Sequence, residues 1–129
     1  MPNTITRQTI VDGSRDLVVK VHLLSDGSEE TATALIVAAD YSPVFTNCRL
    51  KKLDVITSAP LLQGILLWGA DVNVRLCALT PNISYQFDWS EFGGLPNNGG
   101  TGRTGNILLT TLGLASADEL TLIFFIEKV

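Results

Sequence analysis

The chain contains one histidine, His22, which is the first residue to weigh as a catalytic group. A Ser–His–Asp triad and most zinc sites depend on imidazole, so His22 would have to take part in either. It lies in an alternating segment, with Lys20 on the same polar side of a predicted strand. We interpret His22 as a surface or interface residue, and a small hydrolase built around it stays as an alternative.

A second chemical pattern is the run Gly100–Gly105, which formally matches GxGxxG. That motif binds a pyrophosphate when a strand precedes it and a helix follows, because the helix N-terminus faces the phosphates. Here Asn106–Thr111 follows, which is typical of a strand, and no Walker lysine precedes a Ser or Thr. We interpret the run as part of a loop that is flexible or ordered by assembly.

Carboxylates and thiols are the remaining candidates for chemistry. Asp71, Asp88 and Glu91 lack the spacing of an EF-hand, and we expect them to be solvated near strand ends. Cys48 and Cys77 are too few and too far apart for a disulfide framework or a metal site, so we expect free thiols that serve packing. The sequence therefore predicts no enzyme, no cofactor and no metal.

The clearest alternation in the chain places Ile83, Tyr85, Phe87 and Trp89 on one side of a predicted strand. Such a face belongs to the core or to an interface. Aromatic rings also stack on sugars, so a carbohydrate-binding sandwich that uses Trp68 or Trp89 is another alternative.

Length and composition limit the classes of protein. A chain of 129 residues is typical of one domain. Charged residues make up only 17%, against about 25% in an average protein, so we expect partners to cover part of the surface. The net charge is −4 and the nine Lys+Arg are scattered, which argues against binding nucleic acid.

Targeting signals are not evident. The segment 1–10 lacks the basic and apolar regions of a signal peptide. The longest apolar stretch, around 64–70, is far shorter than the roughly 18 residues of a membrane span. We expect a soluble chain that does not contact a membrane.

Period-two alternation, interrupted by turn residues, predicts an all-β, antiparallel sandwich of about eight strands. One segment, Thr31–Ala39, is open between a strand and a short helix, with the strand favoured. Asp12-Gly13 and Asp26-Gly27 are predicted turns. The predicted strands are Thr4–Val11, Leu17–Leu23, Thr31–Ala39, Cys48–Thr57, Ile65–Trp68, Val72–Leu79 (these two as a buried hairpin), Ile83–Trp89, Ile107–Leu112 and Leu120–Glu127.

Two strands suggest their places in a sheet. Lys51 and Lys52 in Cys48–Thr57 are the kind of residues that protect an edge strand from pairing. The last strand, Leu120–Glu127, is apolar on both faces, which predicts a central position or a subunit contact.

Several segments together carry a resemblance to a known family. They span nearly the whole chain, and they are Thr9–Val21, Glu30–Thr33, Leu66–Trp68 with Asn73–Val74, Phe87–Leu95, Thr104–Leu108 and Leu120–Lys128. In these segments the chain resembles small virion structural proteins of tailed bacteriophages, whose members are similar to capsid decoration (cement) proteins.

The resemblance implies one β-sandwich domain over residues 1–129, jelly-roll-like, that performs no reaction. It implies a homotrimer on the virion capsid surface, assembled in the bacterial host cytoplasm, where it binds the major capsid protein and stabilises the shell. A structural role in the neck, tail or baseplate is the alternative, since the same fold serves many positions.

We expect contacts with other subunits at two segments, an N-terminal arm (1–8) and the glycine-rich loop 93–105. A glycine-rich loop loses much conformational entropy on ordering, which makes most sense where a partner orders it. Arg103 is the only charge of that loop. The predicted contact residues are Pro2, Asn3, Thr4, Arg7, Leu95, Pro96, Asn97, Asn98, Thr101, Arg103 and Thr104.

Overall fold

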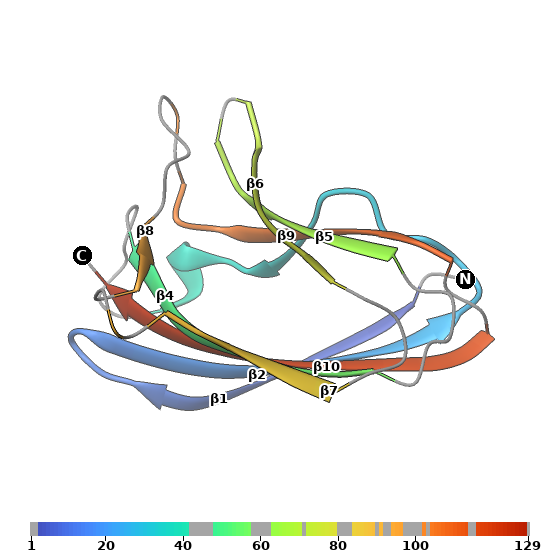
Figure 1. The fold of residues 1–129 in the computed structure, drawn as a ribbon, viewed down its shortest axis with the longest axis horizontal. Helices are drawn as coiled ribbons and strands as arrows, with labels where there is room; N and C mark the ends of the chain where they lie inside the picture. Colours follow the sequence, from blue (N-terminus) through green and yellow to red (C-terminus); the bar gives the residue numbers. More distant parts are fainter. Residues whose placement is uncertain are drawn as a thin grey trace.

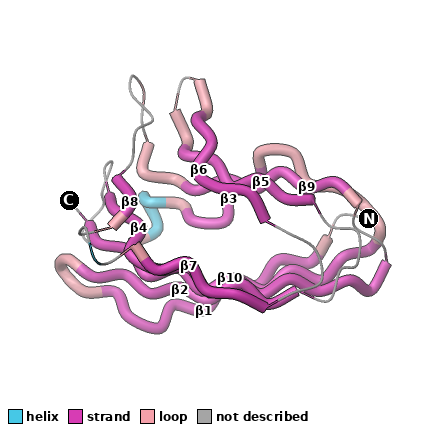
Figure 2. Tube along the Cα trace, viewed as in Figure 1, coloured by secondary structure: helices cyan, strands magenta, loops and turns pink. Residues whose placement is uncertain are grey.

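Two antiparallel sheets face each other in the computed structural model, which describes residues 3–41, 48–57, 63–70, 72–79, 84–89, 91, 94–96, 102, 104–113 and 116–128 (Figure 1 and Figure 2). The strands are β1 (Thr4–Asp12), β2 (Asp16–Asp26), β3 (Thr33–Ile36), β4 (Cys48–Thr57), β5 (Gln63–Trp68), β6 (Val74–Leu79), β7 (Ser84–Asp88), β8 (Leu95–Pro96), β9 (Ile107–Leu112) and β10 (Ser116–Lys128). A short 3-10 helix, η1 (Ala38–Asp40), follows β3.

The order of the strands is that of a jelly roll. The first sheet runs β1-β2-β10-β4-β7, with β8 also paired to β4, and the second runs β3-β9-β5-β6. Among the described strands from β2 onward, the chain crosses between the sheets at every connection except the β5–β6 hairpin and the β7–β8 link. The predicted antiparallel, jelly-roll-like sandwich is confirmed, and β1 and β8 are additions to its eight principal strands.

Alternation in the sequence decides which side of each strand is buried. In β2, Leu17, Val19, Val21 and Leu23 are at most 1% exposed, and the intervening Lys20 is exposed. The β1–β2 hairpin closes at the predicted Asp-Gly turn, where the Gly13 amide donates to the carbonyl of Asp16 at 2.8 Å. The two hairpin strands and their turn are therefore confirmed.

The last strand, β10, lies at the centre of the first sheet between β2 and β4, as predicted. Leu120, Leu122, Phe124 and Ile126 point into the core. The second sheet contributes Leu66, Trp68, Ile107 and Leu109 to the same core. The space between the two sheets is thus filled by aliphatic and aromatic side chains.

The segment predicted as a strand over Thr31–Ala39 is a strand only at β3. Its alternation is interrupted, because Leu35 and Ile36 are both buried and the pairing with β9 shifts between Ala34 and Ile36. The amide of Ala38 then donates to Asn106 Oδ1 at 2.8 Å, where η1 begins. A side chain distant in sequence therefore ends the strand, which local alternation could not reveal.

The prediction that Lys51 and Lys52 protect a sheet edge is wrong. Strand β4 is an interior strand, with β10 on one side and β7 and β8 on the other. Both lysines instead meet acids of neighbouring strands: Lys51 Nζ lies 3.4 Å from Glu127 Oε2, and Lys52 Nζ lies 4.0 Å from Asp88 Oδ2.

The hairpin predicted near residues 65–79 is confirmed, but β6 is an edge strand rather than a buried one.

Helices are almost missing from the described part of the chain, and none that it contains has the length and apolar character needed to cross a membrane.

Candidate protein-binding surfaces

The predicted N-terminal arm is a folded edge strand from residue 4 onward. Asn3 is buried, its side-chain amide donates to Glu30 Oε2 at 2.7 Å, and its Oδ1 accepts from the Asp26 amide at 3.0 Å. Thr4 is exposed at the start of β1. These contacts attach the N-terminal residues to the domain, and a role in subunit contact stays a prediction for Asn3, Thr4 and Arg7.

Arg7 joins the two sheets along one open side of the sandwich. It projects from β1, and its guanidinium donates to the carbonyl of Leu35 at 2.7 Å and to that of Ala34 at 2.6 Å. Both carbonyls belong to β3, the edge strand of the other sheet. Arg7 therefore stabilises the contact between the two sheets, which its position in the sequence did not reveal.

The glycine-rich loop is described only in part. Leu95 is half-buried against the core, and Leu95–Pro96 form β8, which pairs with β4. Thr104 is exposed, and its amide donates to the carbonyl of Gly69 at 3.1 Å. The predicted contact residues outside the described part are Pro2, Asn97, Asn98, Thr101 and Arg103.

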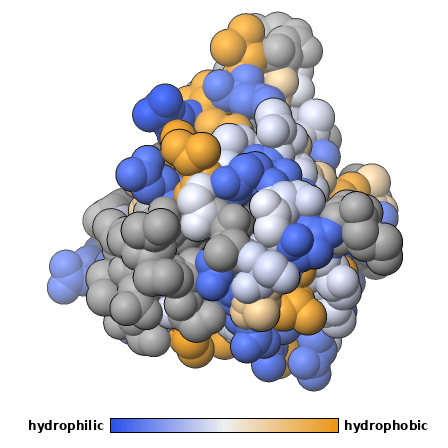
Figure 3. Space-filling view, turned by 90° about the vertical axis from the view of Figure 1, so that its right-hand side faces the viewer, coloured by the Kyte–Doolittle hydropathy of each residue, from blue (hydrophilic) through white to orange (hydrophobic). Residues whose placement is uncertain are grey.

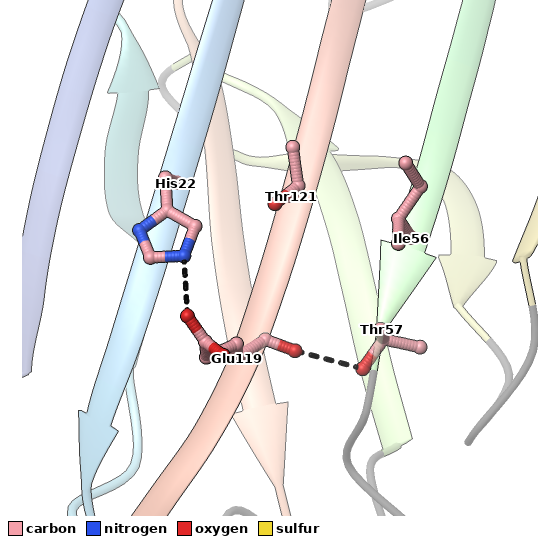
Figure 4. A pocket seen from close by; sticks show the side chains of 5 residues that line it. All are labelled: His22, Ile56, Thr57, Glu119 and Thr121. Carbon is pink, nitrogen blue, oxygen red and sulfur yellow. Dashed lines mark hydrogen bonds and ion pairs between the residues drawn. The ribbon is translucent and has the colours of Figure 1, made fainter.

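Of the described residues considered for catalysis, His22 on β2 and Asp88 on β7 are separated by β10 and β4. His22 pairs with Glu119, with Nε2 and Oε1 3.0 Å apart, while the Thr57 hydroxyl donates to the Glu119 carbonyl at 3.2 Å (Figure 4). The His22–Glu119 pair joins β2 to β10 on the outward side of the first sheet, and the buried Thr57 joins β4 to the backbone of β10. Asp88 lies beside Lys52, and Asp71 is outside the described residues. Within the described ranges, no cluster of three or more His, Cys, Asp or Glu side chains could hold a metal ion.

The thiols behave as packing groups. Cys48 is fully buried and Cys77 partly so, and neither forms a disulfide. Burial raises the pKa of each thiol to about 12, which keeps both in the unreactive protonated form at neutral pH.

The aromatic residues offer little surface to a sugar. Trp68 is 1% exposed in the core. Trp89 is half-buried and stacks on Phe87, with ring centroids 5.3 Å apart. A carbohydrate-binding site is therefore not supported at Trp68, because its ring is enclosed by the protein.

The outward side of the first sheet, here called the charged face, is covered by ionised groups from several strands. Ion pairs join Arg15 and Lys51 to Glu127, His22 Nε2 lies 3.0 Å from Glu119 Oε1, and Asp54 accepts from Gln86 at 2.6 Å. Apolar side chains such as Ile56 lie between these groups. The face therefore combines ion pairs with exposed or half-buried apolar side chains such as Leu24 and Phe125.

The outward side of the second sheet, here called the apolar face, carries far fewer charges. Strand register and alternation place its side chains together, and Arg75 is the one charged residue among those described. Leu112 is 61% exposed. The members of this face are Ala34, Gln63, Ile65, Leu67, Arg75, Ala78, Leu108, Thr110 and Leu112.

A groove of about 550 Å³ crosses this face over β6, β5 and β9. Ile65 and Leu112 line it together with Arg75, and the smaller Ala78 and Thr110 leave the space between them. In Figure 3, orange patches occur in the upper part of the molecule, which the second sheet forms, and others occur in the lower part, which the first sheet forms. The sequence did contain a signal for this surface, since Ile65 and Leu67 make β5 apolar on both faces, and one face of a two-layer sandwich points outward.

The β5–β6 hairpin projects from the same sheet beyond the body of the domain (Figure 1). Val72 near its tip is 77% exposed. The base is fixed by a hydrogen bond from the Gly69 amide to the carbonyl of Asn106 at 2.9 Å, together with the bond from Thr104 to Gly69. The base of the hairpin is therefore bonded to the segment 104–106, which leads into β9.

Fold and surface together define a jelly-roll β-sandwich with one charged and one apolar outward face. No family model and no curated protein matches the chain. Among solved structures, a cupin domain from Bordetella pertussis Tohama I is similar over 100% of this chain and 98% of that one, at 14% identity and a TM-score of 0.39. A likeness at this level assigns no ligand or activity to the chain.

Proposed function

We propose that this chain is a structural subunit of a bacteriophage virion, a capsid decoration protein that performs no reaction. It binds the major capsid protein on the capsid surface and stabilises the shell, most simply as a homotrimer. The sequence resemblance given above supports the virion setting, and the surface of the domain supports binding to protein.

The observation that carries the proposal is the apolar face. Contiguous exposed apolar side chains on a soluble domain mark sites of association, because water contact with them is unfavourable. On this face Ile65, Leu67 and Leu108 are half-buried neighbours and Leu112 is largely exposed, with Arg75 as the one described charge. The charged face also exposes apolar side chains such as Leu24 and Ile56, but ion pairs run between them, so we assign the capsid contact to the apolar face.

Binding of the purified protein to capsid shells that lack it tests the proposal. Leu112→Glu places a charge on the apolar face at a position that is 61% exposed, so the fold tolerates it. We expect shell binding at least about tenfold weaker, as for a substitution inside an interface. The matched control is Ile56→Glu on the charged face, at a position 52% exposed, which leaves shell binding unchanged.

Two results contradict the proposal. One is wild-type protein that does not bind shells. The other is a virion in which the chain is confined to one vertex in far fewer copies than the capsid protein, which would favour the neck, tail or baseplate. The mass in solution tests the trimer, because a monomer at all concentrations contradicts that part.

A further inference from the structure

Strand β6 is the outer edge of the second sheet. Among the described strands it pairs with β5 alone. An edge strand has backbone N–H and C=O groups directed away from the sheet, and these can pair with a strand of another chain. The edge of β6 runs alongside the groove of the apolar face, because Arg75 and Ala78 belong to both.

Arg75 gives this edge a chemical preference. Its side chain is exposed, and no described residue makes a hydrogen bond or ion pair with it. The described lining of the groove contains no carboxylate, since the other side chains are apolar, hydroxyl or amide groups. A guanidinium on an apolar surface binds carboxylates well, because its donors are directional and weakly hydrated.

We propose that the apolar face binds an extended segment of a partner protein, which adds to β6 as a further strand and places a carboxylate on Arg75. Side chains on one side of an extended strand repeat every second residue. An apolar residue two positions from the acidic one therefore lies beside Ala78, at the β6 side of the groove. This inference rests on the proposed function, because it names the chemistry of the partner at the same surface.

A second copy of the chain is a poorer occupant at this edge. Strand β6 has the sequence VRLCAL, which contains no acidic residue. Two copies paired through β6 would leave both Arg75 side chains without a carboxylate from the partner strand. The occupant we propose is therefore a different, acidic and apolar segment.

Titration of the isotope-labelled full chain with two synthetic peptides tests the inference. The first is acetyl-Thr-Val-Glu-Val-Thr-Val-amide, and the matched peptide has lysine in place of glutamate. We expect the backbone amide signals of β6 to shift with the acidic peptide, which binds about fivefold more tightly than the lysine peptide, as expected for one partly exposed ion pair. Arg75→Glu reverses this preference, and Lys20→Glu on the charged face leaves it unchanged.

Several results overturn the inference. They are equal affinity for the two peptides, an unchanged preference in Arg75→Glu, shifts confined to β1 or β7, or no shift at millimolar peptide. Self-association that Arg75→Glu abolishes also overturns it, since the occupant is then a second copy. If Arg75→Glu binds capsid shells like the wild type, this inference fails while the proposed function stands. If the peptide preference holds and the chain does not bind shells, the proposed function fails instead.

Discussion

Replacing Gly69 by alanine tests how the projecting β5–β6 hairpin is fixed to the domain. A Cβ at this position would lie 2.8 Å from Thr104 Oγ1 and 3.3 Å from Asn106 Cβ. The same neighbours are bonded to Gly69, whose amide donates to Asn106 at 2.9 Å and whose carbonyl accepts from the Thr104 amide at 3.1 Å. An added methyl group therefore pushes apart two segments that these bonds hold together.

The expected cost follows from these contacts. Two backbone hydrogen bonds contribute about 1 kcal/mol each, and the reduced freedom of the unfolded chain returns about 0.4–1 kcal/mol. We expect Gly69→Ala to lower the free energy of unfolding by about 1–2 kcal/mol, which lowers Tm by roughly 3–8 °C for a domain of this size. Urea unfolding, followed by the fluorescence of the buried Trp68 and of Trp89, measures the change.

A control and a double substitution make the test specific. At Gly13 a Cβ would meet only the Asp16 carbonyl oxygen at 3.5 Å, an ordinary contact, so Gly13→Ala changes stability by less than about 0.5 kcal/mol. Thr104→Ala removes the atom closest to the new methyl group. The double variant Gly69→Ala/Thr104→Ala is then less destabilised than the sum of the single changes by about 0.5–1 kcal/mol. Wild-type stability of Gly69→Ala, or strict additivity, refutes the reasoning.

Three further predictions concern the core, the join between the sheets and the thiols. Arg7→Ala removes two hydrogen bonds between β1 and β3 and lowers the free energy of unfolding by about 1 kcal/mol in urea titrations; an unchanged midpoint would show that the join is not needed. Phe124→Ala, in the fully buried side of β10, costs about 3–5 kcal/mol by calorimetry, whereas Phe125→Ala on the half-buried outward side costs clearly less, and equal losses would contradict the burial pattern. Burial raises the pKa of Cys48 and Cys77 to about 12, above the value of about 8.5 in the unfolded chain. The contribution of the two thiols to the free energy of unfolding is therefore complete below about pH 8.5 and is lost as the pH rises toward 12. Urea titrations at about pH 8 and about pH 10 check this, and a double Cys→Ala variant that loses stability as steeply as the wild type would refute it.

Strand periodicity accounts for how much of the fold could be predicted. The alternation of β2 and the apolar character of β10 predicted burial directly, because successive side chains of a strand point to opposite faces and one face of each strand packs in the core. Alternation does not report which strands pair, so it placed Lys51 and Lys52 at an edge. Their partners Glu127 and Asp88 come from β10 and β7, far away in the sequence.

The proposed interaction surface was harder to predict for a similar reason. The low charge leads us to expect that a partner covers part of the domain, but the face that we propose for it is assembled from four strands of the second sheet. The structural role of single residues was also hidden where their partners are remote in the sequence: Arg7 is a predicted contact residue of an arm, and the structure shows that it also joins β1 to β3. Arg75 drew no attention in the sequence, because it stands out only when its neighbours Ile65, Leu67 and Ala78 are placed around it.

A cryo-electron microscopy reconstruction of the virion, resolved well enough to trace this chain, tests the central claim most directly. The proposal predicts many copies on the capsid surface, each with the apolar face around Ile65 and Leu112 against a capsid subunit and with the charged face around His22 and Ile56 toward solvent. A particle that lacks the chain, or copies that meet the shell through the charged face, would contradict it.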